Sequence, residues 1–322
     1  MVGLSELEAI GVAQHWPSRD SVVKGLRAYT PSTMDHAVAY NARLDDRNKK
    51  NATSWIAYFS RGARRQMDAI ADALEDRAAW TGELGESIRD LMFADRMSYF
   101  WHGKFRVLFP THERPLALMD WVFMTNSMAF AFLLGWTEQA IYQGYLTHAA
   151  LNRGYQPRAS YLEHHRRAHA FMLRLFADWR GNGVSHDWPA WGRDVPVYNG
   201  ILERWRDPDP RVLMPWLLAA CDRHTHESNY DTEERQFDFG DYRLTRTPVE
   251  ILLVLRLREH IGLPNPLLDH PLMEPPFDRF PELQPQPAFD ELMQGALRRA
   301  RADWPQFDEA TSVQLVIADS LG

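Results

Sequence analysis

Apolar side chains recur at the three- and four-residue spacing of an α-helix along most of this chain. The clearest stretch places Trp55, Phe59, Met67, Ile70 and Leu74 along one helical face, with polar residues between them. Alternation of apolar and polar positions, which is typical of half-buried β-strands, is nearly absent. The pattern therefore predicts an all-α protein.

Further segments with the same periodicity are expected to be helices. They cover residues 85–100, 116–134, 137–152, 160–179, 211–223, 249–260 and 289–304. Gly135, Gly154 and Gly181 follow the ends of three of these segments, as expected where a helix stops. The polar stretch at residues 45–51 is either a solvent-facing continuation of the first helix or a break before it, so the start of that helix is not defined by the sequence.

A change of composition in the middle divides the chain. Residues 183–210 are dense in glycine, proline and tryptophan, and they predict a connection between an N-terminal helical half, residues 1–182, and an acidic C-terminal half, residues 211–322. The proline-rich tract at 264–287 cannot continue a helix and favours an ordered loop along the surface. We therefore expect two packed helical halves, as a bundle or as stacked helical hairpins. An array of degenerate helical repeats is an alternative architecture.

The most unusual stretch runs over residues 222–242, where seven carboxylates stand against two arginines. A helix is expected directly after it, with Thr247 as N-cap, Pro248 at the first helical position and Glu250 reaching back to the cap amide. The acidic segment should therefore lie outside the core. It is either a solvated linker or a surface for a positively charged partner. In the second interpretation the contacts are Glu227, Asp231, Glu233, Glu234, Asp238 and Asp241.

Charge and composition narrow the functional classes. The formal net charge of −7 argues against a nucleic-acid-binding protein, which needs a basic stripe to neutralise phosphates. The single cysteine, Cys221, allows no intramolecular disulfide and fits a reducing compartment. The N-terminus shows no export signal, and the uncharged stretch at 121–137 is short for a membrane span. We expect a cytoplasmic protein that binds neither nucleic acid nor a membrane. A homodimer of the free protein is left open.

Two histidines, His165 and His169, are four residues apart and would share one helical face, as metal ligands can. Arg166 and Arg167 flank them with positive charge that would oppose a cation, and no third ligand is apparent. We therefore expect that His165 and His169 do not bind a metal.

Other candidate sites are weaker. His224, His226 and Glu227 form a cluster that is expected to be a solvated helix end. The pair Asp45 and Asp46 lacks the third acid of a magnesium site. The chain contains no nucleophile elbow, phosphate-cradling glycine loop or dinucleotide fingerprint. We expect no catalytic residue, no cofactor and no metal.

Three segments resemble a known family. Tyr58-Phe59-Ser60-Arg61-Gly62 resembles the Y-S-R-G-type element of bacterial immunity proteins that neutralise polymorphic DNase toxins. The apolar run from Met119 resembles that family's leucine-rich helix, and the segment around Tyr242 and Glu250 resembles its C-terminal helix. The family's glycine-tyrosine-tryptophan cluster and its closing tyrosine-proline motif are replaced here, by Leu244-Thr245-Arg246 and by residues 268–273.

The resemblance implies an all-helical cytoplasmic protein without catalysis that binds a cognate toxin. In such pairs an acidic surface engages the basic, nucleic-acid-binding face of the nuclease. Two alternatives stay open: a helical enzyme that uses a metal near His165, His169 or Asp45, and a regulatory helical scaffold with another partner.

Overall fold

The computed structural model describes residues 10–28, 34–42, 54–108, 120–155, 166–230, 232 and 237–321. Regular structure in these ranges is helical, apart from one isolated antiparallel bridge between Val184 and Leu321. The prediction of an all-α fold is therefore confirmed.

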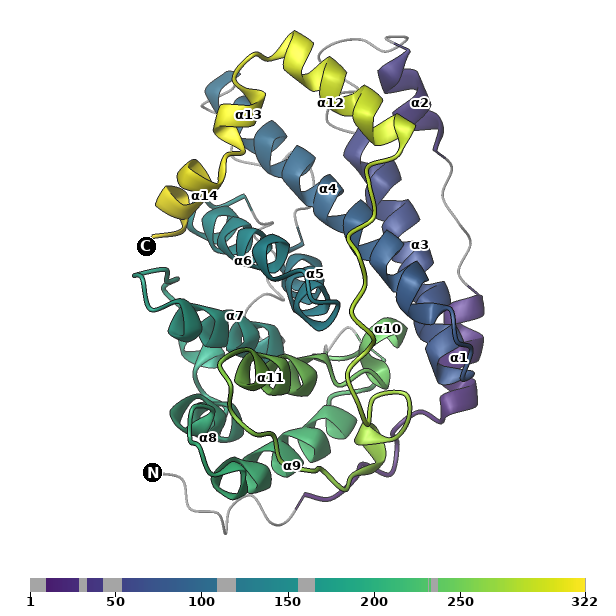
Figure 1. The fold of residues 1–322 in the computed structure, drawn as a ribbon, viewed down its shortest axis with the longest axis vertical. Helices are drawn as coiled ribbons and strands as arrows, with labels where there is room; N and C mark the ends of the chain where they lie inside the picture. Colours follow the sequence, from purple (N-terminus) through teal and green to yellow (C-terminus); the bar gives the residue numbers. More distant parts are fainter. Residues whose placement is uncertain are drawn as a thin grey trace.

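Two long helices form a hairpin along one side of the molecule, and the other large helices lie beside it in layers (Figure 1). The hairpin consists of α3 (Ser54–Leu74) and α4 (Trp80–Leu108). The layers are the pairs α5 (Trp121–Leu133) with α6 (Thr137–Asn152), α7 (Arg167–Arg180) with α11 (Val249–His260), and α8 (Pro196–Arg204) with α9 (Pro210–His226).

The remaining elements pack on this arrangement. They are α1 (Arg19–Arg27), α2 (Asp35–Asn41), α10 (Tyr242–Thr245), α12 (Glu291–Asp303), α13 (Phe307–Ala310) and α14 (Val313–Ser320), with 3-10 turns at Ala190–Gly192 and Pro271–Met273. Local capping fixes several starts, because the side chains of Ser18, Asp120, Asp209 and Asp290 accept hydrogen bonds from backbone amides in the first turns of α1, α5, α9 and α12.

The stretch at residues 183–210, expected as a connection between the two halves, contains a helix, α8. Pro196 occupies the first turn of that helix, where a proline costs no hydrogen bond. Tyr198 and Ile201 of α8 are buried, and Trp205 directly after it is fully buried. Pro196 and Trp205 therefore belong to a packed element.

One large core runs through the molecule and draws on both halves of the sequence. It includes Val22 of α1, Leu91 of α4, Phe171 of α7, Leu253 of α11 and Val316 of α14. A second cluster joins α2, α3 and α4 to α12 and α13, with Tyr40, Tyr58, Phe93, Leu297 and Phe307 among its members. The last helices of the chain thus pack against the first ones.

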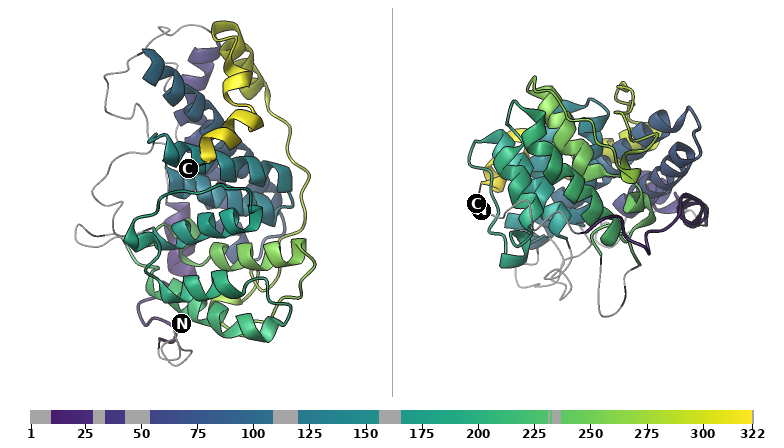
Figure 2. Two further views of the ribbon diagram at one scale, coloured as in Figure 1. Left: turned by 90° about the vertical axis from the view of Figure 1, so that its left-hand side faces the viewer. Right: turned by 90° about the horizontal axis from the view of Figure 1, so that it is seen from below.

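The proline-rich tract crosses the surface from the end with α11 and Pro271–Met273 to α12 at the other end (Figures 1 and 2). Its backbone is held by side chains of the helices beneath it. The Trp136 indole N–H donates to the carbonyl oxygen of Gln284 at 2.6 Å, and Arg89 donates to that of Ala288 at 2.9 Å. The prediction of an ordered surface loop is confirmed.

Helix α5 comes from the uncharged stretch at 121–137 and is buried among its neighbours along nearly its whole length. No helix in the described ranges combines the length and the apolar character needed to cross a bilayer.

Candidate functional site

Hydrogen bonds hold together the described residues on the two sides of the acidic segment between α9 and α10. The backbone N–H of Phe239 donates to the carbonyl oxygen of Glu227 at 3.0 Å, so the two ends of the segment lie side by side. The Ser228 hydroxyl lies 2.8 Å from the carbonyl oxygen of His224 and 3.1 Å from that of Thr245. Glu227, Ser228 and Phe239 therefore form an anchored base on both sides of the segment.

Burial at this base corrects the expectation that the whole acidic segment lies outside the core. Phe237 and Phe239 are buried, and Asp238 between them is 2% exposed. Asp238 accepts from the backbone N–H of Ala168 at 3.2 Å and lies 3.4 Å from the Arg223 guanidinium. Burial raises the pKa of Asp238 to about 6, although Arg223 opposes the shift. This carboxylate is part of the interior.

Glu227 and Asp241 are also engaged within the protein. Glu227 is half-buried and lies 3.7 Å from Arg223. Asp241 caps α10 by accepting from the backbone N–H of Arg243, and the Arg243 guanidinium donates to it at 2.9 Å. Burial opposes ionisation of Asp241, but the charge and hydrogen bonds of Arg243 outweigh it and lower the pKa of Asp241.

The remaining three candidates, Asp231, Glu233 and Glu234, lie outside the described residues. They lie in the sequence between Glu227 and Phe239. Of the described carboxylates, Glu227 and Asp238 share Arg223, and Asp241 pairs with Arg243.

His224 and Glu250 are in contact in the core. This contact corrects the expectation of a solvated helix end at His224 and the expectation that Glu250 reaches back to the cap of its helix. Both side chains are fully buried, and the His224 Nδ1 lies 2.8 Å from a Glu250 carboxylate oxygen. The helix begins at Val249 with Pro248 as its cap, and Glu250 turns inward instead of reaching back to a Thr247 cap. His224 also stacks on Phe239 at 3.7 Å between ring centroids, so the histidine is not part of a solvated helix end.

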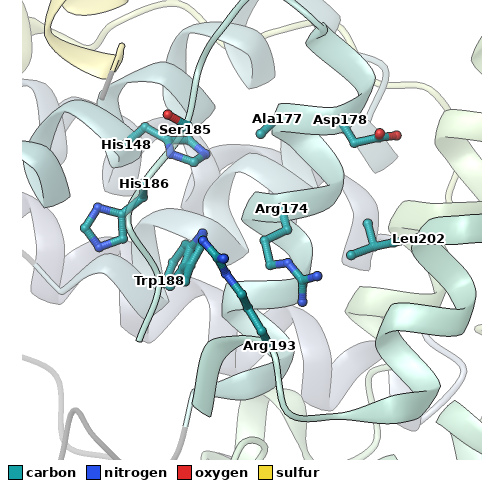
Figure 3. A pocket seen from close by; sticks show the side chains of 9 residues that line it. All are labelled: His148, Arg174, Ala177, Asp178, Ser185, His186, Trp188, Arg193 and Leu202. Carbon is teal, nitrogen blue, oxygen red and sulfur yellow. The ribbon is translucent and has the colours of Figure 1, made fainter. Parts of the chain in front are cut away.

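A hollow of about 430 Å³ opens beside α7, between that helix, the segment after it and α8 (Figure 3). Arg174 and Arg193 project into it, and Trp188 and Leu202 supply apolar wall. His186 stands against the edge of Trp188, with ring centroids 4.8 Å apart. None of these residues was singled out as a site residue by the sequence.

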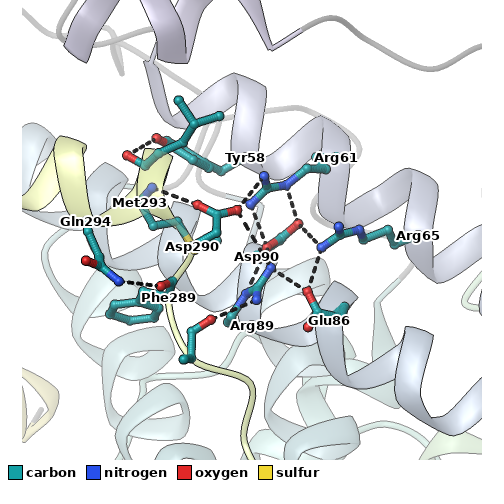
Figure 4. A network of polar contacts seen from close by, with 12 residues as sticks. Tyr58, Arg61, Arg65, Glu86, Arg89, Asp90, Phe289, Asp290, Met293 and Gln294 are labelled. Carbon is teal, nitrogen blue, oxygen red and sulfur yellow. Dashed lines mark hydrogen bonds and ion pairs between the residues drawn. The ribbon is translucent and has the colours of Figure 1, made fainter.

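The Tyr58–Gly62 element lies in a network that ties three helices together (Figure 4). Arg61 of α3 donates to both carboxylate oxygens of Asp90 on α4, at 2.5 and 2.9 Å, and pairs with Asp290, the cap of α12, at 2.7 Å. The Tyr58 hydroxyl donates to the carbonyl oxygen of Leu292 at 3.0 Å. In this structure the element positions the C-terminal helices on the first hairpin.

The histidine pair considered for a metal is only half described. His169 is fully buried, with its ring edge-on to Trp121 at 6.2 Å between centroids, and burial lowers its pKa well below the ordinary value. His165, Asp45 and Asp46 lie outside the described residues. Within the described ranges, no three or more histidine, cysteine or carboxylate side chains are grouped as metal ligands.

Comparison of the chain with protein-family models, with curated proteins and with solved structures finds no match.

Proposed function

We propose that this chain is an immunity protein of interbacterial competition. It binds a cognate toxin, a nuclease effector, in the cytoplasm and neutralises it through the acidic segment between α9 and α10, without catalysis of its own. The observation that carries the proposal is the anchored base of the acidic segment: the backbones of Glu227 and Phe239, which flank its central carboxylates in the sequence, are hydrogen-bonded to each other.

Anchoring matters because a partner surface that is already positioned loses less conformational entropy on binding. Arg223 and Arg243 pair with carboxylates of the base and hold them within the protein. A nuclease must carry a basic groove for phosphates, and an acidic segment is complementary to it in charge. The segment would therefore steer association and occupy the groove.

The contacts divide into two groups under this proposal. Asp231, Glu233 and Glu234 face the toxin and carry the attraction. Glu227, Asp238 and Asp241 hold the base through Arg223, Ala168 and Arg243.

The test uses the product of the gene adjacent to this one. Co-expression of the two proteins should restore growth, and the chain with Asp231→Lys, Glu233→Lys and Glu234→Lys should not. In kinetic binding measurements at low salt, the triple reversal should slow association by at least about tenfold, and the difference should shrink as ionic strength rises.

A charge-matched control reverses three exposed carboxylates elsewhere, with Asp278→Lys, Glu282→Lys and Glu309→Lys. This control should rescue growth and associate nearly as fast as the parent chain, and circular dichroism should show the same helix content for all three proteins. Failure of the parent chain to rescue growth contradicts the immunity function. Equal association of both triple variants removes the acidic segment from the interface.

A further inference from the structure

Two arginines share the hollow beside α7 without a carboxylate partner in the described part of the chain. The Arg174 Nη1 donates to the carbonyl oxygen of Gly192 at 3.1 Å, which holds the guanidinium at the pocket wall. Arg193 follows one residue later and reaches toward Trp188, beside Arg174 (Figure 3).

The nearby carboxylates pair with other side chains and not with the two pocket arginines. Asp178 lines the same pocket, but it is paired with Arg206 and accepts from the Trp205 indole N–H at 2.7 Å. Asp194, which follows Arg193, pairs with Arg167 at 2.8 Å. The two pocket arginines therefore keep their positive charges uncompensated by these neighbours.

Electrostatics at Arg174 favours an incoming anion. Burial and, after it, the charge of Arg193 both lower the pKa of Arg174. An anion between the two guanidinium groups would relieve the repulsion and replace lost hydration with charge-assisted hydrogen bonds. His148 and His186 add no positive charge at neutral pH, because burial lowers the pKa of His148 to about 4 and also lowers that of His186.

The remaining wall consists of Ser185 and apolar side chains. Trp188 is 7% exposed, and Leu202 and Ala177 complete the surface beside the arginines. A volume of about 430 Å³ is within the range of small-molecule pockets and accommodates an anionic group together with a small organic portion.

We propose that this pocket binds a small organic phosphomonoester. Arg174 and Arg193 hold the phosphate, since two guanidinium groups match a dianion in charge and each can donate paired hydrogen bonds to it, and the organic part lies against Trp188 and Leu202. This site lies on α7, the segment that follows it and α8, and the proposed ligand is distinct from the toxin.

The probe is phenyl phosphate, titrated into the full chain by calorimetry at pH 7.5 and constant ionic strength. One-to-one saturable binding is expected. Arg193→Gln and Arg174→Gln should each weaken it by about tenfold or more, because each removes charged hydrogen bonds to the ligand. Arg211→Gln, at an arginine whose side chain is 84% exposed at the start of α9, is the matched control and should bind like the parent.

Benzoate, phenol and inorganic phosphate separate the contribution of the phosphate charge to binding from that of the apolar ring. Benzoate should bind more weakly because it carries one negative charge, phenol should not bind, and inorganic phosphate should bind more weakly because it lacks the apolar part. Absence of saturable binding of phenyl phosphate, or its full retention in the Arg174→Gln, Arg193→Gln double variant with unchanged circular dichroism, would overturn the site. Benzoate binding as tightly as phenyl phosphate would overturn its assignment to phosphate.

Discussion

Two buried carboxylates on helix α4 show how strongly the surroundings of a single residue decide its chemistry. Asp90 has a fully buried side chain and is surrounded by Arg61, Arg65 and Arg89, which lie 2.5, 3.1 and 2.8 Å from its oxygens. Asp95 is 7% exposed and accepts a hydrogen bond from the Gln143 amide at 2.7 Å. Burial raises the pKa of Asp95 to about 8, and the charge of Asp120 adds to the shift.

Replacement of Asp95 by asparagine should therefore change how stability depends on pH. Between the unfolded pKa of 3.8 and the folded pKa of about 8, the folded protein holds a proton on Asp95 that the unfolded chain has released, so stability falls as pH rises. Asparagine can still accept from Gln143 and has no proton to lose. The stability gain of Asp95→Asn should grow with pH over this range, by at most about 1.4 kcal/mol per pH unit. Urea unfolding at several pH values measures it.

Asp278→Asn, at an exposed position, is the control and should leave the pH dependence unchanged. If Asp95→Asn and the parent differ by the same amount at pH 5 and pH 8, Asp95 is ionised in the folded protein and its buried state does not set this dependence.

At the scale of elements, α3 and α4 pack closely where α3 has a glycine. A Cβ on Gly62 would stand 2.8 Å from the Leu91 Cγ and 3.1 Å from the Asp90 Cβ. The Ser87 hydroxyl donates to the carbonyl oxygen of Gly62 at 2.7 Å, so the backbone of one helix touches the side chains of the other. Gly62 and Arg61 thus contribute to one function, which is to hold the hairpin together.

Gly62→Ala should destabilise the protein even though alanine favours a helix. Overpacking of this contact should cost about 1–3 kcal/mol. Gly82 of α4 is the matched control, since a Cβ there meets no atom within 4 Å, and Gly82→Ala should stabilise by up to about 1 kcal/mol. Chemical denaturation measures both changes. A gain in stability for Gly62→Ala would show that the two helices can move apart at little cost.

For the whole molecule, the arrangement of the core decides whether the halves of the sequence are independent. Residues from α1 to α14 meet in one core, and α12 and α13 complete a second cluster with α2, α3 and α4. A polar contact also joins the two halves of the sequence, because Asp290 at the start of α12 pairs with Arg61 of α3. Neither half covers its own apolar faces.

We therefore expect fragments 1–182 and 211–322 not to fold separately. Each should bind a hydrophobic dye and lack cooperative thermal unfolding, because the apolar surface that is buried between them drives folding. Co-expression of 1–182 with 183–322 is the control and should restore a cooperative transition. Cooperative unfolding of one half alone, with native near-ultraviolet circular dichroism, would show that this half is an autonomous domain.

The sequence by itself determined the helical class, the ordered proline-rich loop and several helix positions, among them Val249–His260 and Thr137–Asn152. Periodicity and capping are local signals, carried by residues within a few positions of one another. The surface role of Asp231, Glu233 and Glu234 remains a prediction of the sequence.

Tertiary structure alone decided which charges meet. Asp238 is in the interior because the chain brings it to Ala168 and Arg223, and Glu250 lies beside His224 instead of at its own helix cap. The two arginines of the pocket come from α7 and from the turn before α8, and nothing in their spacing marks them as a pair. Contacts of this kind depend on the path of the chain through space, which the local pattern of apolar and polar residues does not record.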